Sequence, residues 1–420
     1  MKNQGTKDCI HPWWRVSLPP AVKLTALVAL FFIAIAPFEI RAQTGSTQAP
    51  KASSQPGAVT QQGGAVQFAF GGNAAQIPAT YLDHLVFFPA KVNDSRPLLF
   101  QVDSTAATSS IDAGRADEQR LTNLSGPTLH LSGVDVMLPD FARGTKDNFA
   151  ALVGRAYEGT LGKDFLDHFV VELDYGRQTA QLHDPAVFHY SAKAKVFPLR
   201  FVGPVPVVRA KFNLGGKEYD ADFGVNTALD APIRISQRYA SAHRINVHRT
   251  FPATDEPLDA KAVAVRLKSF QIGPYAVDSP MGEIAETVLP PGDAKLAGEI
   301  GGGMLRRFIV VLDYTHQQMI LDPGNKYPDD DSADVSGISM VAKGPGLKTF
   351  QVVSVAPGTP AADAKIQKGD VIAGIDTDPA ADLTLLEVRN LFRQVGHSYK
   401  LLLERNGQEI PVTIQMRRLL

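Results

Sequence analysis

The alternation of apolar and polar residues predicts β-structure through the middle of the chain. In Leu161–Leu182 (LGKDFLDHFVVELDYGRQTAQL), a glycine turn and a short apolar segment precede a β-hairpin that turns near Asp174-Tyr175. Ile300–Leu321 (IGGGMLRRFIVVLDYTHQQMIL) repeats this pattern 139 residues later. The two copies share nine of 22 positions, namely Gly162/Gly301, Leu166/Leu305, Phe169/Phe308, Val171/Val310, Leu173/Leu312, Asp174/Asp313, Tyr175/Tyr314, Gln178/Gln317 and Leu182/Leu321. This level of identity favours an internal duplication over shared turn chemistry alone.

A weaker repeat lies upstream of each copy. Leu98–Asp112 (LLFQVDSTAATSSID) and Glu218–Ile233 (EYDADFGVNTALDAPI) each contain a β-rich run, an aspartate and then small residues. The aspartates, Asp103 and Asp222, precede the first glycine of the stronger repeat by 59 and 79 residues. An isolated Asp after a strand is usually a turn or cap residue. Its recurrence upstream of both copies makes Asp103 and Asp222 candidate functional residues.

An apolar segment near the amino terminus indicates export. Leu24–Ala36 (LTALVALFFIAIA) contains 13 uncharged, mostly apolar residues, and several Lys and Arg residues precede it. It is short for a membrane span and has the length of the apolar core of a secretory signal. Residues 1–42 are therefore predicted to be a signal peptide or, if uncleaved, an amino-terminal membrane anchor. Either alternative places the bulk of the chain outside the cytoplasm, in the periplasm or secreted. Residues 43–65, rich in Gln, Ser, Thr, Gly and Pro, are predicted to be a disordered tether.

The pattern changes again towards the carboxy terminus. An acidic, polar stretch at residues 327–336 is predicted to be a linker. Beyond it, Phe350–Val355 has the pattern of a strand and Leu383–Val395 has helical periodicity. Two final strands are joined at Asn406-Gly407, a strong hairpin signal. Residues 337–420 are therefore expected to form a small α+β module.

Composition excludes several classes of function. The chain has 420 residues, 44% of them apolar and 20% charged, which is typical of globular proteins of two to four domains. Its 42 Lys and Arg residues nearly balance 43 Asp and Glu residues, which argues against a general nucleic-acid-binding protein. The single cysteine, Cys9, precludes an intramolecular disulfide, a cysteine zinc site and CxxC redox chemistry. The ten histidines are scattered, and the chain has no G-x-S-x-G nucleophile elbow in a strand–helix context.

The repeated motifs resemble those of bacterial retropepsin-like aspartic proteases, over about residues 66–326. In that family each lobe carries an Asp at the end of a strand, followed by a second signature in which an apolar residue precedes a glycine, as Leu161-Gly162 and Ile300-Gly301 do here. The resemblance implies a mainly β, bilobal aspartic-protease fold with lobes at 66–190 and 191–326. It implies a catalytic pair, Asp103 and Asp222, which would activate a water to hydrolyse a polypeptide substrate. Two such carboxylates share one proton, and no cofactor or metal is needed.

The chain departs from the family's Asp-Thr/Ser-Gly motif in both lobes. Asp103 is followed by Ser104 and Thr105, and Asp222 is followed by Phe223 and Gly224. In the family, the second-place hydroxyl braces the two loops against each other, and a Phe there cannot make that hydrogen bond. The third-place glycine allows a tight turn that β-branched Thr adopts less readily. Two hypotheses therefore stand: an exported aspartic endopeptidase, and a catalytically degenerate scaffold that binds peptides through its carboxy-terminal module.

The carboxy-terminal module resembles a bacterial PDZ domain. The segment VVSVAPGTPAADAKIQKGDVIAGID, residues 352–376, carries the resemblance. PDZ domains bind the end of a peptide as an added strand beside a helix. The resemblance implies a groove between the strand Phe350–Val355 and the helix Leu383–Val395. The candidate binding residues are Gly346, Leu347 and Lys348 in a carboxylate loop, with Phe350 and Val352 on the strand. The partner would be a C-terminal peptide or a substrate segment; the alternative is that the module only braces the lobes. A membrane partner is expected only through an uncleaved amino-terminal segment.

Overall fold

The structure is a computed structural model. It describes residues 66–139, 141–144, 149–190, 194–247, 250–252, 262–287, 289, 296–324, 327 and 334–420. The predicted signal or anchor segment, the predicted tether and most of the predicted linker lie outside these residues. All described residues belong to one compact unit, Gln61–Leu420. Within them, no helix is both long enough and apolar enough to cross a membrane.

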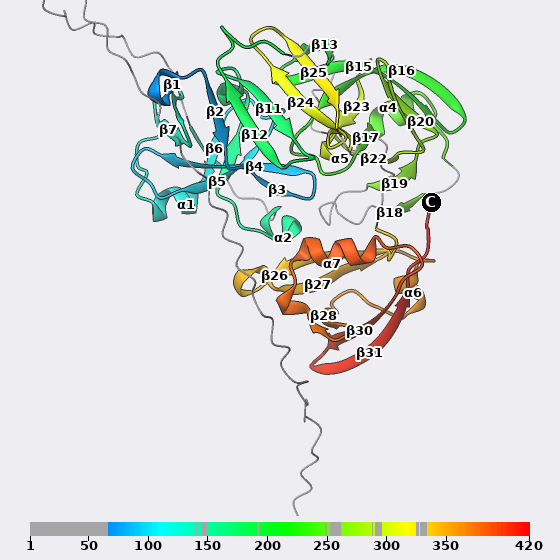
Figure 1. Cartoon of the computed structure of the whole chain (residues 1–420). Coiled ribbons are helices and arrows are strands. Elements are labelled where there is room, and N and C mark those ends of the chain that lie inside the picture. Colours follow the sequence, from blue (N-terminus) through cyan, green and yellow to red (C-terminus); the bar gives the residue numbers. More distant parts are fainter. Residues whose placement is uncertain are drawn as a thin grey trace, which may run out of the picture. The chain divides into compact units, whose positions relative to one another are not determined.

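The first lobe, called lobe 1 here, is formed largely by one twisted sheet (Figure 1). Its strand order is β1-β8-β7-β4-β5-β10-β6-β9, and β3 pairs with β4. The elements are β1 (Val66–Phe68), β3 (Thr80–Leu82), β4 (Leu85–Val92), β5 (Leu98–Val102), β6 (Ser110–Asp112), α1 (Ala113–Glu118), β7 (Thr128–Leu131), β8 (Val134–Met137), β9 (Ala142–Gly144), α2 (Phe149–Val153) and β10 (Gly159–Leu161). Strand β10 pairs parallel to β5, so two segments that are distant in sequence meet at the centre of the sheet.

The second lobe, lobe 2, repeats this arrangement. Its strand order is β18-β19-β22-β17-β23-β16-β15-β20-β21, and β14 pairs with β15. The elements are β14 (Arg200–Val202), β15 (Val205–Leu214), β16 (Lys217–Val225), β17 (Ile233–Ser236), α4 (Gln237–Ala242), β18 (Phe251–Pro252), β19 (Val263–Arg266), β20 (Ser269–Ile272), β21 (Tyr275–Asp278), β22 (Met281–Ala285) and β23 (Leu296–Ile300). Strand β23 pairs parallel to β16, as β10 does to β5.

A six-stranded sheet joins the lobes, with the order β13-β25-β24-β11-β12-β2. Its elements, with the short helices that precede the two hairpins, are β2 (Ala74–Ile77), α3 (Lys163–Leu166), β11 (Val170–Asp174), β12 (Thr179–His183), β13 (Lys195–Pro198), α5 (Gly302–Leu305), β24 (Phe308–Asp313) and β25 (Gln318–Pro323). The duplicated hairpins are therefore β11–β12 and β24–β25, and they lie at the centre of this sheet (Figure 1).

The two hairpins meet with internal two-fold symmetry. Along the β11–β24 ladder, Val170 pairs with Asp313 and Asp174 pairs with Ile309. Val170 and Ile309 are equivalent residues of the two copies, and so are Asp174 and Asp313, so the two pairs are related by the symmetry of the duplication. Asp174 and Asp313 both accept a hydrogen bond from the backbone N–H three residues later, at 2.9 and 3.0 Å. The recurring Asp-Tyr pairs therefore build the hairpin turns.

The carboxy-terminal module has its own sheet and its own core. Its strand order is β26-β27-β28-β30-β31, and β29 pairs with β28. The elements are β26 (Ile338–Lys343), β27 (Thr349–Val355), α6 (Pro360–Asp363), β28 (Val371–Ile375), β29 (Asp378–Pro379), α7 (Leu385–Phe392), β30 (Ser398–Arg405) and β31 (Gln408–Gln415). Its apolar cluster is separate from the large cluster that spans both lobes. The predicted mainly β, bilobal architecture with a small carboxy-terminal α+β module is confirmed.

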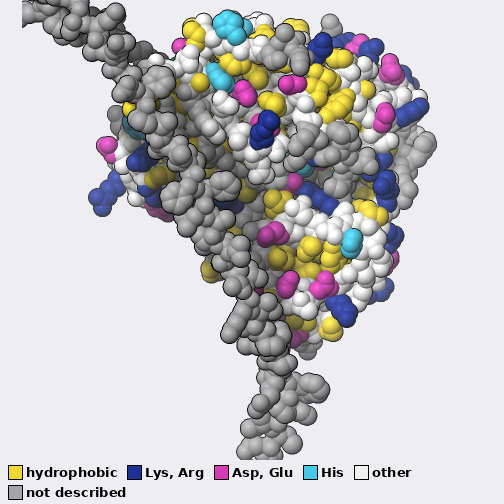
Figure 2. All heavy atoms as spheres, in the orientation of Figure 1, with side chains coloured by type: hydrophobic (Ala, Val, Ile, Leu, Met, Phe, Trp, Pro, Cys, Tyr) yellow, Lys and Arg dark blue, Asp and Glu magenta, His cyan; other side chains and the backbone are white. Residues whose placement is uncertain are grey.

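The described surface carries both signs of charge. On the face shown in Figure 2, Lys and Arg side chains are interspersed with Asp and Glu side chains. This agrees with the near-balanced formal charge of −1 for the whole chain.

Candidate functional site

Two equivalent turns lie where the lobes meet. Asp103 follows the end of β5, and its backbone N–H donates to the carbonyl of Leu161 at 2.9 Å. Asn226 follows the end of β16, and its N–H donates to the carbonyl of Ile300, also at 2.9 Å. Leu161 and Ile300 are themselves equivalent residues of the duplicated motif. The residue of lobe 2 that corresponds to Asp103 is therefore Asn226.

The strand register agrees with this correspondence. In lobe 1, Val102 pairs with Leu161, which precedes Gly162. In lobe 2, Val225 pairs with Ile300, which precedes Gly301. Both glycines sit in crowded positions, because an added Cβ would lie 2.9 Å from the carbonyl oxygen of Ala106 at Gly162 and 2.1 Å from that of Ala231 at Gly301. Their backbones accordingly pack directly against the turn of their own lobe.

Asp222 does not meet Asp103, which corrects the predicted pairing. It lies within β16, four residues before Asn226, and pairs across the ladder with Arg209. Its carboxylate accepts hydrogen bonds from Arg200 at 2.8 Å and Arg209 at 3.0 Å. Both arginine side chains are about half exposed. Asp222 is thus part of a surface ion-pair cluster and is not at the inter-lobe turns.

The residues after Asp222 are structural parts of the strand. Phe223 is fully buried and packs edge-on against Phe212 and Phe270. At Gly224, an added Cβ would lie 2.8 Å from Leu289 and 2.9 Å from Val205. The apparent loss of the bracing hydroxyl at Phe223 is therefore a consequence of the wrong alignment.

The bracing interaction is made by the residue that follows Asp103 in one turn and Asn226 in the other. Ser104 Oγ donates to the carbonyl of Val225 at 2.7 Å, and Thr227 Oγ1 donates to the carbonyl of Val102 at 2.7 Å. Each hydroxyl oxygen also accepts the other residue's backbone N–H at 3.0 Å. Both residues are fully buried. This reciprocal set of four hydrogen bonds fixes the two turns against each other, and the sequence analysis missed Thr227.

The Asp103 carboxylate is held by its own turn. Its Oδ1 accepts hydrogen bonds from the N–H and the hydroxyl of Thr105 at 2.8 and 2.6 Å, and from the N–H of Ala106 at 3.2 Å. Thr105 therefore fits the third place of the motif and supplies an extra donor. Close by, the Tyr314 hydroxyl donates to the carbonyl of Ser104 at 3.3 Å. Burial, together with the charges of Asp103 and Asp167, raises the pKa of Tyr314 well above its usual range, so the phenol remains a neutral donor.

Asn226 repeats that turn geometry with an amide in place of a carboxylate. Its Oδ1 accepts the N–H of Ala228 at 2.9 Å, just as Asp103 accepts that of Thr105. Its Nδ2 donates to Oε1 of the fully buried Glu299 at 2.7 Å. The paired turns therefore present one carboxylate and one amide. This arrangement was readable in principle, since FQVDST and FGVNTA align once Asn is allowed in place of Asp.

The carboxy-terminal sheet has β26 at one edge and β31 at the other. Strand β26 lies at the end of the strand order, and β27 lies between it and β28. At Val352, β27 is bonded on its β28 side as well, because the N–H of Val352 donates to Asp370 and its carbonyl accepts from Gly369, both at 2.8 Å. Of the two strands β26 and β27, β26 therefore lies at an edge of the sheet and β27 does not.

Residues 336–416 match a family model described as a PDZ domain. This module is a PDZ domain. The predicted groove beside Phe350–Val355 is contradicted, because β27 is paired on both sides and Phe350 and Val352 are buried in the domain's own core; the edge strand next to β27 is β26. Gly346, Leu347 and Lys348 belong to the turn between β26 and β27, where Gly346 and Leu347 have φ of 65° and 57°. At the start of β26, the Asp334 carboxylate accepts the N–H groups of Ser336 and Gly337.

Comparisons of the whole chain give weaker likenesses. A comparison with curated proteins finds no match. Among solved structures, an aspartic proteinase from Irpex lacteus is 12% identical, with 61% of this chain and 98% of that chain covered and a TM-score of 0.38. A photosystem II D1 C-terminal processing protease is 24% identical, with 20% of this chain and 23% of that chain covered and a TM-score of 0.19.

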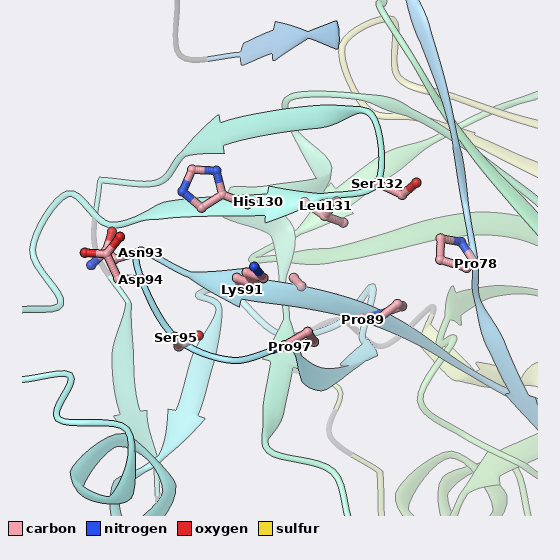
Figure 3. Close-up of a pocket in the computed structure, with 11 residues that line it drawn as sticks. Pro78, Pro89, Lys91, Asn93, Asp94, Ser95, Pro97, His130, Leu131 and Ser132 are labelled. Atoms are coloured by element: carbon pink, nitrogen blue, oxygen red, sulfur yellow. The ribbon is translucent and has the colours of Figure 1, made fainter.

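Two other features of the described residues resemble binding sites. Asp83, His84 and Asp230 form the one group of metal-ligating side chains found among the described residues, but Arg393 already binds the Asp83 carboxylate through two hydrogen bonds. A depression of about 620 Å³ on lobe 1 (Figure 3) is lined by Pro78, Pro89, Ala90, Lys91, Asn93, Asp94, Ser95, Pro97, His130, Leu131 and Ser132. It includes no residue of the paired turns or of the PDZ domain, so it is separate from both candidate sites.

Proposed function

We propose that this protein is an exported peptide-binding protein whose PDZ domain captures extended peptides and whose two lobes do not hydrolyse them. The observation that carries the proposal is the amide of Asn226 at the position equivalent to Asp103. The lobes resemble those of aspartic proteases and retain the reciprocal bonds between Ser104 and Thr227. They serve here as a rigid scaffold.

The chemical reason is the need for two carboxylates. In the aspartic mechanism, one ionised carboxylate removes a proton from water while a protonated carboxylic acid polarises the scissile carbonyl. An amide neither accepts that proton nor cycles between the two states. Nδ2 of Asn226 is moreover committed to Glu299 at 2.7 Å, which orients the amide away from an acid–base role. Asp103 alone supplies half of the required pair.

The second candidate function is an aspartic endopeptidase. It is favoured by the intact bracing bonds and by the carboxylate of Asp103, whose Oδ1 is held by hydrogen bonds from its own turn. This function requires a peptide bond to be cleaved with a single carboxylate at the paired turns.

One experiment separates the two functions. A peptide library is incubated from acidic to neutral pH with wild type, Asp103→Asn and the surface control Asp222→Asn. In parallel, the same proteins are tested for binding of heptapeptides with free carboxylates. We expect binding without cleavage in all three. Cleavage by wild type that disappears in Asp103→Asn and persists in Asp222→Asn would establish the endopeptidase instead.

Export is supported by Leu24–Ala36 and by the Lys and Arg residues that precede it. Cell fractionation and amino-terminal sequencing of the full-length product test this part of the proposal. We expect the protein outside the cytoplasm with its mature terminus near residue 42. Recovery from the cytoplasm with Met1 intact would contradict it.

A further inference from the structure

Strand β26 is buried on both faces, although it lies at an edge of the PDZ sheet. Along β26, Ile338, Met340 and Ala342 point into the domain's own core. Because side chains alternate along a strand, Ser339 and Val341 point to the opposite face. They are nevertheless only 7% and 5% exposed, and neither belongs to that core. Something outside the core of the PDZ domain therefore covers this strand.

An element of lobe 1 lies against this strand. Helix α2 contacts β26, and the residue after the helix, Gly154, lies against the start of α7. A Cβ added to Gly154 would lie 2.6 Å from Cβ of Leu385. On its other side, Val153 packs in an apolar cluster of lobe 1 with Phe87 and Tyr157. The segment 149–154 thus bridges lobe 1 and the two elements that border the peptide groove.

A buried ion pair holds the far end of α7 to the same lobe. Arg393, the C-cap residue of α7, donates to both carboxylate oxygens of Asp83 at 3.0 and 2.6 Å. The two side chains are only 12% and 17% exposed. Asp83 lies in the turn between β3 and β4, and the next residue, His84, bonds to Asp230 of lobe 2. Bidentate, desolvated pairs of this kind are strongly directional.

We propose that lobe 1 occludes the peptide groove of the PDZ domain in cis, with α2 placed against β26 and Asp83 holding α7 through Arg393. An extended peptide can add to β26 only when this contact opens. The occupant of the closed groove is therefore the chain's own segment 149–154, and the occupant of the open groove is a peptide strand. Only the identity of the peptide as the occupant of the open groove rests on the proposed peptide-binding function.

The test uses the full chain and two independent openings of the contact. Arg393→Gln removes the bidentate pair, with Arg418→Gln, at an exposed position, as its matched control. Gly154→Ala places a methyl group against Leu385 and leaves the ion pair intact. Circular dichroism and thermal melting establish that each variant is folded. The first readout is hydrogen exchange of the β26 backbone. The second is binding of a fluorescent pool of random heptapeptides with free carboxylates.

We expect both openings to accelerate exchange in β26 and to strengthen peptide binding by about tenfold or more, which is a modest share of what a desolvated pair contributes. Arg418→Gln is expected to match wild type in both readouts. Unchanged β26 exchange in both Arg393→Gln and Gly154→Ala overturns the occlusion. Faster exchange without peptide binding supports the occlusion but removes the peptide-binding function, so the two proposals fail separately.

Discussion

Replacing Asn226 by Asp restores the second carboxylate and tests why an amide stands there. In wild type, Nδ2 of Asn226 donates to Oε1 of Glu299 at 2.7 Å, and Glu299 is fully buried. In Asn226→Asp, that donor becomes a carboxylate oxygen facing another carboxylate. At an effective dielectric constant of about 20, two unit charges at that separation repel by roughly 6 kcal/mol. The pair avoids most of this repulsion by retaining a proton.

The cost of retaining the proton sets the expected magnitude. Holding a carboxyl protonated at pH 7 against an ordinary pKa of about 4 costs roughly 4 kcal/mol, at about 1.4 kcal/mol per pH unit. Asn226→Asp should therefore be about 4 kcal/mol less stable than wild type near neutrality. Because a raised carboxyl pKa means that the folded state binds more protons, this deficit shrinks as the pH falls and nearly vanishes near pH 4.

Urea unfolding followed by circular dichroism across this pH range measures the deficit. The double variant Asn226→Asp/Glu299→Gln restores a donor opposite the new carboxylate and should recover most of the stability at neutral pH. A deficit that is independent of pH, or one that Glu299→Gln leaves in place, would refute the reasoning. The same double variant holds two aspartates at the paired turns, so it is also the best candidate for gaining peptidase activity.

Three further predictions concern the turns, the surface and the inter-lobe cluster. Ser104→Ala and Thr227→Ala should each cost about 1–3 kcal/mol in urea unfolding, because each leaves buried partners unbonded; the double variant should cost less than the sum, and strict additivity would contradict a reciprocal unit. Asp222→Asn should change the free energy of unfolding by less than about 1 kcal/mol, since its arginine partners are about half exposed; a larger loss would show that the cluster is structurally important. Burial lowers the pKa of His84, but Asp230 and Asp83 raise it by more, so it lies above its ordinary value. The stabilisation it provides should be complete below the ordinary histidine pKa of about 6.5 and lost as pH rises through the raised value. Thermal melting as a function of pH should show this loss in wild type, and His84→Gln should abolish it; an unchanged profile in the variant would exclude His84 as its source.

The repeats were predictable because their shared residues occupy positions that tolerate little change. Gly162 and Gly301 pack against carbonyl oxygens, and the hairpins after them pair with each other across the lobes. The two copies have the same residue at positions where both the packing and the turn geometry are fixed. The PDZ domain was predictable for a similar reason, since its turns and core strands follow one another within a short span.

The prediction for the second turn was wrong because it assumed an aspartate at that position. Asp222 has the residue type that the motif requires, whereas Asn226 has the position that it requires. Asn226 accepts the backbone N–H of the second residue after it, as Asp103 does. Identity of a side chain and equivalence of a backbone position are different properties, and only strand register distinguishes them. The predicted groove beside β27 was wrong for a related reason. Strands β26 and β27 are both apolar, and their sequences do not show which of the two forms the edge of the sheet.

The two-fold pairing of β11 with β24 has a consequence for the history of the chain. An interface in which each strand meets its own counterpart is the kind of interface that a symmetric dimer has. In such a dimer one codon specifies both turn residues, so a change from carboxylate to amide occurs in both halves or in neither. Joining the halves in one polypeptide separates the two positions. The coexistence of Asp103 and Asn226 is therefore a combination that only the fused form can hold.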